Sequence, residues 1–327
     1  MSVANNKLHL SSPSLKFISR LFILLSIFYF MNNNLFAAGL QFLRIPVFSR
    51  SEGMAGAYTG VAEGCESFFY NPAGLSAGEK TDYEATAGYV SWLEGMSKES
   101  IVFITPADIF PIVRGISIDY FTVGDLKKYN VSGTEIGALD YQDIAAAVNL
   151  GADMGNFIFG CNLKYLKEDI DKYKGSGFAV DAGILYPFSK TNRIGLSASN
   201  MGSFSLEDVS IDLPITIRAG LGISGKKVTL GLDAEKNADN TYLHLGGELK
   251  LQERYFLRAG IKNAEMGNVT TFGLGMNTEL GVQDEWKPSF QQGQKTASKK
   301  VLKINYSFQG GGYFSESIHR FDIGVSF

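Results

Sequence analysis

The stretch SEGMAGAYTGVAEGCESFFYNPAGL occupies residues 51–75 and differs from everything that follows it. Glycines at positions 53, 56, 60, 64 and 74 permit tight bends and close approach to a neighbouring backbone. Asn71-Pro72-Ala73-Gly74 is a turn signal, because proline fixes its own φ and biases the preceding residue away from helix. The stretch predicts a small, irregular and compact segment, although an ordinary surface loop uses the same residue types.

The chain after residue 80 reads as a succession of amphipathic strands separated by turns. Their lengths approach the ~10 residues of a tilted strand that crosses a membrane. We expect an all-β fold, an antiparallel barrel of about 14 strands that follows an N-terminal plug. The expected strands are 83–89, 99–105, 115–122, 141–150, 157–165, 178–186, 193–201, 215–223, 228–235, 242–251, 255–262, 269–280, 301–308 and 318–327.

Each strand separates two kinds of residue onto its two faces. In 228–235, for example, Val228, Leu230 and Leu232 alternate with Thr229 and Asp233. A soluble barrel buries the apolar face, whereas a membrane barrel turns it outward to the hydrocarbon and keeps the polar face inside. The pattern alone fits both. The N-terminal leader, the terminal strand and the aromatic content favour a transmembrane barrel, whose closure leaves no unpaired sheet edge in lipid.

Residues 1–38 have the features of a cleaved signal peptide. Three basic residues and no acidic residue precede an apolar run at 21–31, and Leu35-Phe36-Ala37-Ala38 supplies small residues for cleavage. The apolar run is shorter than the ~20 residues that span a bilayer, so a retained anchor is the weaker alternative. We expect a mature chain that begins near Gly39 and is exported.

The last strand ends the chain on an aromatic residue. Phe321, Ile323, Val325 and Phe327 occupy one face of Arg320–Phe327. This arrangement resembles the assembly signal of bacterial outer-membrane barrels. It predicts that the barrel assembly machinery inserts the chain into the outer membrane, among outer-membrane lipid.

Composition and motifs argue against two other classes of protein. Without residues 1–38 the chain has 27 basic and 33 acidic residues, a net charge of about −6, which does not suit a nucleic-acid partner. The sequence contains no nucleophile elbow, zinc-protease motif or phosphate-binding loop. We therefore expect no enzyme activity, no catalytic residue, no cofactor and no metal site.

Two parts of the chain carry a resemblance to a known family. Gly53–Tyr58, Tyr70–Leu75 and segments of 210–327, such as Leu213–Leu221 and Phe256–Gly260, look like the PorV/PorQ family, which is similar to FadL-type outer-membrane transporters. The resemblance implies a plug formed by residues 39–80 inside a barrel formed by residues 81–327. The implied plug motif comprises Gly53, Gly56, Ala57, Asn71, Pro72, Ala73 and Gly74.

Charged residues gather on the polar faces of the strands between 215 and 262. In a membrane barrel they line the lumen, and we expect them to form an ionic ladder that holds the plug, with Glu52, Glu63 and Glu66 pairing to Arg218, Lys250 or Arg258. The candidate lumen and plug-contact residues are Arg218, Asp233, Glu235, His244, Glu248, Lys250 and Arg258.

Two functions remain open on this evidence. The first is transport or binding of a hydrophobic or amphipathic, lipid-like molecule across the outer membrane. The alternative is a non-conducting component of a type IX-like secretion or attachment system, with secretion-system proteins as partners. The longest expected external loops, 123–140 and 202–213, are candidate contact sites. Segment 283–298 is long for a periplasmic turn, so it is either a flexible partner-facing loop or a sign that the expected strand parity is wrong.

Overall fold

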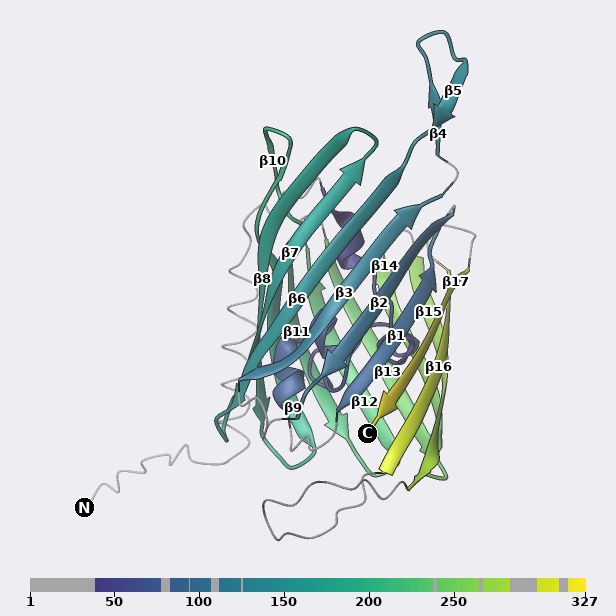
Figure 1. The fold of residues 1–327 in the computed structure, drawn as a ribbon. Helices are drawn as coiled ribbons and strands as arrows, with labels where there is room; N and C mark the ends of the chain where they lie inside the picture. The colour runs from purple at the N-terminus through teal and green to yellow at the C-terminus, as the bar shows by residue number, and fades with distance from the viewer. Residues whose placement is uncertain are drawn as a thin grey trace, which may run out of the picture. The chain divides into compact units, whose positions relative to one another are not determined.

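Fourteen antiparallel strands close into a barrel, as the sequence predicts (Figure 1). The computed structural model describes residues 39–77, 83–93, 95–106, 112–124, 126–237, 240–264, 267–282, 299–311 and 317–327. The ring closes because β9 pairs with both β8 and β11, and β1 pairs with β17. Its strands are β1 (Glu84–Ser91), β2 (Met96–Ile104), β3 (Val113–Val123), β6 (Tyr141–Asp153), β7 (Ile158–Ile170), β8 (Tyr173–Pro187), β9 (Asn192–Leu206), β11 (Thr216–Ser224), β12 (Val228–Lys236), β13 (Thr241–Leu251), β14 (Tyr255–Ala264), β15 (Gly267–Val282), β16 (Lys299–Gly311) and β17 (Ile318–Ser326).

The two expected external loops contain regular structure. Residues 202–206 continue β9 and pair with β8, and β10 (Val209–Ile211) folds back onto β9. The loop prediction for 202–213 was wrong because Gly202, Ser203 and Ser205 have low strand propensity, whereas ladder pairing with β8 determines their conformation. Within 123–140, β4 (Lys127–Tyr129) and β5 (Glu135–Ala138) form a separate two-stranded hairpin.

The outward face of the barrel is apolar and the inward face is polar. Large side chains such as Leu232, Leu245 and Phe272 are each more than half exposed on the outside. On the same strands Asp233 and His244 point inward and are buried. This arrangement is the inverse of a soluble barrel and is that of a transmembrane barrel, as expected from the sequence.

The barrel has two distinct ends, which we call the terminal end and the hairpin end. At the terminal end β1 begins and β17 stops, and Tyr83 and Phe327 exchange two backbone hydrogen bonds of 3.0 Å while their rings stack at 5.7 Å. The β4–β5 hairpin extends from the opposite end (Figure 1). Residues 1–38 and 283–298, for which we predicted a signal peptide and a partner-facing loop, lie outside the described residues.

Residues 39–77, hereafter the N-terminal segment, lie within the lumen as four short helices joined by turns (Figure 1). The four helices are η1 (Gln41–Arg44), α2 (Ser49–Gly53), α3 (Ser67–Tyr70) and η2 (Pro72–Ser76). Residues 45–62 and 65–76 are almost entirely buried, although about half of them lie in turns and irregular structure. No helix in the described part of the chain has the length and hydropathy needed to cross a membrane.

Candidate functional site: the lumen and the N-terminal segment

Lumen-facing side chains bind the backbone of the N-terminal segment. Asp233 Oδ2 accepts hydrogen bonds from the backbone amides of Tyr58 at 2.9 Å and Thr59 at 2.7 Å. In the other direction, wall side chains donate to carbonyl oxygens of the segment, from Asn162 to Phe68, Asn149 to Pro72, Ser197 to Tyr70, Arg218 to Phe69, Thr271 to Gly53, Arg320 to Pro46, and Lys98 to Phe42 and Ile45. An irregular segment buried in a lumen needs such partners, because unpaired backbone groups are costly away from water.

A track of glycines on the inner wall lets the segment approach the strands backbone to backbone. A Cβ atom added at Gly195 would collide with the carbonyl of Thr59, and one at Gly231 with the carbonyl of Ala57. Every strand in spatial order from β6 to β15 contributes to this glycine track, which comprises Gly151, Gly160, Gly183, Gly195, Gly220, Gly222, Gly231, Gly246, Gly260 and Gly273. Larger side chains would hold the segment off the wall, so the track fixes its position.

The Asn-Pro-Ala turn ties two parts of the segment to the barrel. The Asn71 side chain donates to the carbonyls of Thr59 and Ile184, both at 3.1 Å, and accepts from the Ala73 amide at 3.2 Å. Asn71 therefore caps η2, and Pro72 occupies its first position, where a missing N–H costs nothing. The turn lies against Gly160 of β7 and Gly183 of β8.

The glycines of the predicted motif differ in what they do. Gly53 lies against Gly273 and Arg258, whereas Gly74 packs within the segment against Ser67 and Ala62. Gly56 has a φ of +75°, a backbone conformation that side chains rarely adopt. Ala57 is fully buried and its carbonyl lies against Gly231.

The charged residues predicted for β11–β14 do line the lumen, but they pair differently from our expectation. Arg218 binds Glu235 at 2.8 Å across β11 and β12, and Arg258 binds Glu248 at 2.7 Å across β14 and β13. Glu248 also binds Arg50 of the N-terminal segment at 2.9 Å. Arg218 and Arg258 are therefore neutralised by wall acids, and the segment's Glu52 pairs instead with Arg320 of β17 at 3.4 Å.

Glu63 and Glu66 accordingly have other neighbours. Glu63 pairs with Arg50 at 2.7 Å and approaches Arg193 at 4.0 Å. Glu66 accepts a hydrogen bond from the Cys65 thiol at 3.3 Å. The expected pairing of these acids with Arg218, Lys250 or Arg258 was wrong. Sequence periodicity predicts which side chains of a strand point inward, but it does not predict which of them lies at the same level along the barrel axis as a given residue of the N-terminal segment.

The two remaining predicted residues lie at different depths. His244 Nδ1 is 2.7 Å from the carbonyl of Ala55, and its Nε2 is 3.5 Å from Glu235. Lys250 pairs with Glu253 near the turn that follows β13. Across the described residues, no three or more His, Cys, Asp or Glu side chains converge in a way that would hold a metal ion.

A polar cavity of about 420 Å³ opens toward the terminal end of the lumen, and we call it the vestibule. It lies between the N-terminal segment and the wall, and its lining includes Arg50, Glu66, Glu84, Lys303 and Asp322. Glu66 is only 5% exposed, and burial, with the nearby Asp322 carboxylate as the next cause, raises its pKa to about 7. The vestibule thus offers water and both signs of charge, which suits a polar group and not a hydrocarbon.

The half of the lumen toward the hairpin end, hereafter the apolar half, contains a large apolar cluster beside the buried carboxylates of Asp143 and Glu168, and the sequence analysis did not find this cluster. Phe42 of η1 stacks on Phe121 of β3 at 6.0 Å, within a buried cluster that includes Val90, Leu166 and Phe204. The missed signal lies along the inward face of single strands. On β7, Gly160, Asn162 and Lys164 contact or face the N-terminal segment. The same face then carries Leu166 and, at the hairpin end, Glu168.

Lys98 stands inside this apolar region. It is 1% exposed, donates to the carbonyls of Phe42 at 3.2 Å and Ile45 at 3.0 Å, and lies over the rings of Phe42 and Phe69. Asp119 supplies a counter-charge at 3.7 Å. Lys98 therefore fastens the beginning of the N-terminal segment across the apolar half of the lumen.

Solved structures with the same fold include a FadL homologue and two toluene transporters. A Pseudomonas aeruginosa FadL homologue aligns with a TM-score of 0.55 and 11% identity, over 86% of this chain and 98% of its own. The Pseudomonas putida toluene transporter TodX aligns at 0.52 and 11% over 90% and 99%, and the Ralstonia pickettii toluene transporter TbuX at 0.52 and 12% over 90% and 98%. No protein-family model matches the sequence, and no curated protein matches it. The similarity establishes a FadL-like fold, and a closed barrel with an apolar exterior belongs in a bacterial outer membrane.

Proposed function

We propose that this protein transports or binds a hydrophobic or amphipathic small molecule in the outer membrane. The observation that carries the proposal is the apolar hairpin half of the lumen, where Phe42 and Phe121 stack among other buried apolar side chains. A lumen that only excluded water would need no apolar region, since the polar wall of β11–β14 already holds the segment. The toluene transporters that share this fold add support by analogy.

The two parts of the N-terminal segment are held in different ways, which suggests where a passage opens. Residues 53–76 are fixed by the glycine track and by Asp233 and Asn71. Residues 40–48 cross the apolar half and are held by side chains, mainly Lys98 and Arg320. A side chain can change rotamer, whereas a contact between two backbones cannot adjust in this way. Residues 40–48 are therefore the part of the segment that moves to admit a ligand.

An amphipathic ligand suits the division of the lumen. Its hydrocarbon part would replace the contacts of Phe42 in the apolar half, and its polar group would face the vestibule, where Arg50 and Lys303 lie. Apolar burial contributes about 25 cal/mol for each Å² of surface removed from water. When Phe42 moves away it exposes apolar surface of the wall, so the ligand must cover most of that surface to compensate.

Uptake measurements test the proposal. Cells that lack their own long-chain fatty-acid and hydrocarbon transporters would express the full chain, and uptake of labelled oleate and of toluene would be followed. Phe121→Gln puts a polar group in the apolar half and should reduce uptake at least 5-fold. Tyr120→Gln, on the adjacent outward position, is the matched control and should leave uptake unchanged. A folded barrel without uptake, and without co-purifying ligand by mass spectrometry, would refute transport.

A second candidate function is attachment or secretion of proteins, as in the PorV/PorQ family. Two observations favour it: the glycine track closes the lumen by backbone contact, and the β4–β5 hairpin extends outward with Tyr129, Val131 and Ile136 exposed. Deletion of residues 127–138 should abolish co-purification of surface proteins under this function and leave oleate uptake intact. Retention of every partner after the deletion would count against it.

A further inference from the structure

The outward face of β13 and β14 has a single gap in its ridge of large side chains. On β13 the outward positions are Leu243, Leu245, Gly247, Leu249 and Leu251, and on β14 they are Tyr255, Leu257, Ala259 and Ile261. The two smallest of these residues, Gly247 and Ala259, are direct partners in the ladder. Because cross-strand partners lie side by side on one face, the two small side chains leave one common hollow.

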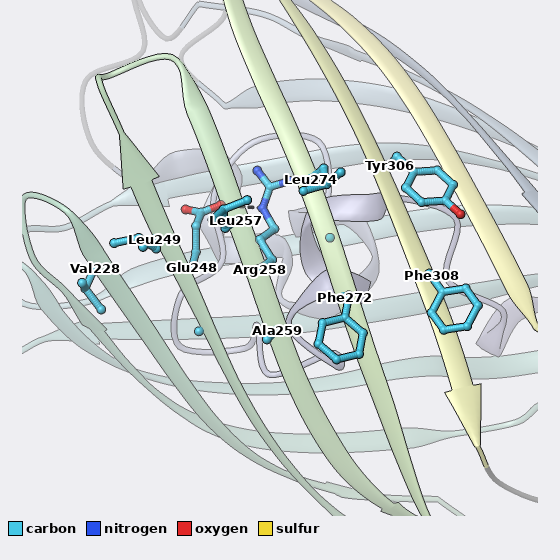
Figure 2. A pocket seen from close by; sticks show the side chains of 12 residues that line it. Val228, Glu248, Leu249, Leu257, Arg258, Ala259, Phe272, Leu274, Tyr306 and Phe308 are labelled. Carbon is cyan, nitrogen blue, oxygen red and sulfur yellow. Dashed lines mark hydrogen bonds and ion pairs between the residues drawn. The ribbon is translucent and has the colours of Figure 1, made fainter.

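Larger side chains bound the hollow and extend it into a groove. Across the sheet, Ala259 pairs with Phe272, and Phe272 pairs with Phe308. Leucines 249, 257 and 274 border it on the side of the terminal end. Figure 2 shows the rings of Phe272, Tyr306 and Phe308 along one side of the groove and Val228 with Leu249 at the other. The open groove has a volume of about 610 Å³, within the range of small-molecule sites.

The groove lies on the lipid-facing side of a transmembrane barrel, so its occupant is hydrocarbon. Its end at Val228 adjoins a group of cations. Lys227 precedes Val228 in the turn before β12, and its carbonyl accepts from the Lys250 amide at 2.8 Å, which places this turn beside the turn that holds Arg254. Lys227 and Arg254 are exposed, and Glu253 between the turns already pairs with Lys250.

The distance from these cations to the gap matches one leaflet of a bilayer. Ala259 lies five residues along β14 from Arg254, about 17 Å at ~3.4 Å per residue. With the ~40° tilt of barrel strands this is a depth of about 13 Å, close to half of a hydrocarbon core ~30 Å thick. A lipid whose head group sits at the turns thus reaches the gap with its acyl chain.

We propose that this groove is a binding site for an anionic glycerophospholipid, with one acyl chain between Leu257 and Phe272 and its phosphate at Lys227 and Arg254. The glycine–alanine gap supplies the shape that holds a chain, and the two cations select the head group. Neither cation lines the lumen, so the site is separate from the proposed transport path.

A fluorescence experiment on the full chain in vesicles tests the site. Phe272→Trp places a reporter in the groove, and phosphatidylglycerol or phosphatidylcholine with brominated acyl chains quenches it on contact. The signal of the parent protein, which has its own tryptophans, is subtracted. Each surface cation is worth about 5-fold in affinity for an anionic lipid, so two cations should let phosphatidylglycerol compete about 25-fold better than phosphatidylcholine.

Three comparisons decide the result. The double variant Lys227→Gln and Arg254→Gln should remove the preference, and Ala259→Leu should fill the gap and lower quenching by both lipids. Phe178→Trp on the outward face of β8 is the matched reporter outside the groove and should show no preference. Equal quenching of the groove reporter by the two lipids, or an unchanged preference in the double variant, would mean ordinary boundary lipid and overturn the proposal. Heat-modifiable migration on gels identifies the folded barrels that enter the comparison.

Discussion

Replacing Asp233 by alanine should release the middle of the N-terminal segment without unfolding the barrel. The carboxylate is 1% exposed and accepts hydrogen bonds from the amides of Tyr58 and Thr59 on one oxygen. Hydrogen bonds to a charged group contribute about 1.5–3 kcal/mol each. Part of this sum is offset because the variant no longer buries a charge, and we expect a local loss of about 3 kcal/mol.

Amide hydrogen exchange measures this loss directly, because protection reports the free energy of local opening. A loss of about 3 kcal/mol predicts exchange about 150-fold faster at Tyr58 and Thr59. Asp233→Asn keeps an acceptor oxygen and loses the charge, so it should accelerate exchange only about 5-fold. Peptide-resolved mass spectrometry of the barrel in vesicles provides the readout.

Asp322→Asn is the matched control, since Asp322 lies on β17, five strands away from β12, and accepts from the Ser49 amide at 2.7 Å. It should accelerate exchange at residues 49–51 and leave Tyr58 and Thr59 protected. If Asp233→Ala folds and both amides keep the protection of the parent, the wall carboxylate does not hold the segment and the reasoning fails.

Three further predictions concern the vestibule, the glycine track and the barrel seam. Because the pKa of Glu66 rises to about 7 from its ordinary 4.5, the folded protein keeps a proton that the unfolded chain has lost, and its stability should fall by about 3 kcal/mol as pH rises between these values and then level off. Glu66→Gln should flatten this dependence in urea titrations from pH 4 to 8, and a slope equal to that of the parent would contradict the assignment. Gly231→Ala should lower the yield of folded barrel at least 5-fold because its Cβ meets a backbone carbonyl, whereas Gly247→Ala on the outward face should not; equal yields on heat-modifiability gels would exclude the steric argument. Phe327→Ala removes the ring that stacks on Tyr83 and should reduce the amount assembled in the outer membrane several-fold, as judged by cell fractionation, with normal assembly as the contrary result.

The barrel was predictable because its signal is repeated along the chain. Each strand shows the same alternation, and closure follows from the need to pair every backbone group in lipid. On β12 the residues Leu230, Leu232 and Asp233 lie on the predicted faces. Strand ends were less predictable, since Gly202 and Ser205 extend β9 through pairing and not through propensity.

The lumen was predictable only in part, because its contacts join residues distant in sequence. Periodicity carries no information on the position of Glu63 along the barrel axis relative to Arg218, so the expected ion pair between them was wrong. Glu63 pairs with Arg50 instead, and Arg218 pairs with Glu235. The apolar half was missed because Leu166 and Phe204 belong to strands whose inward face is mostly polar or glycine. Wall glycines were visible as a residue type, yet their alignment into a track required the register of nine neighbouring strands.

The glycine track also constrains the order in which this molecule is made. The N-terminal segment leaves the ribosome first, but the partners of Ser49, Tyr58 and Gly53 follow it by 273, 175 and 218 residues. Until those strands have been made, Met54–Ala62 is an apolar, glycine-rich peptide that lacks its packing and hydrogen-bond partners on the barrel wall. If β1 and β17 paired before the N-terminal segment had entered the lumen, the barrel would close empty. The glycine track leaves room only for a main chain without bulky side chains. The N-terminal segment is thus among the last parts of the chain to reach its final contacts, although it is synthesised before the strands that bind it.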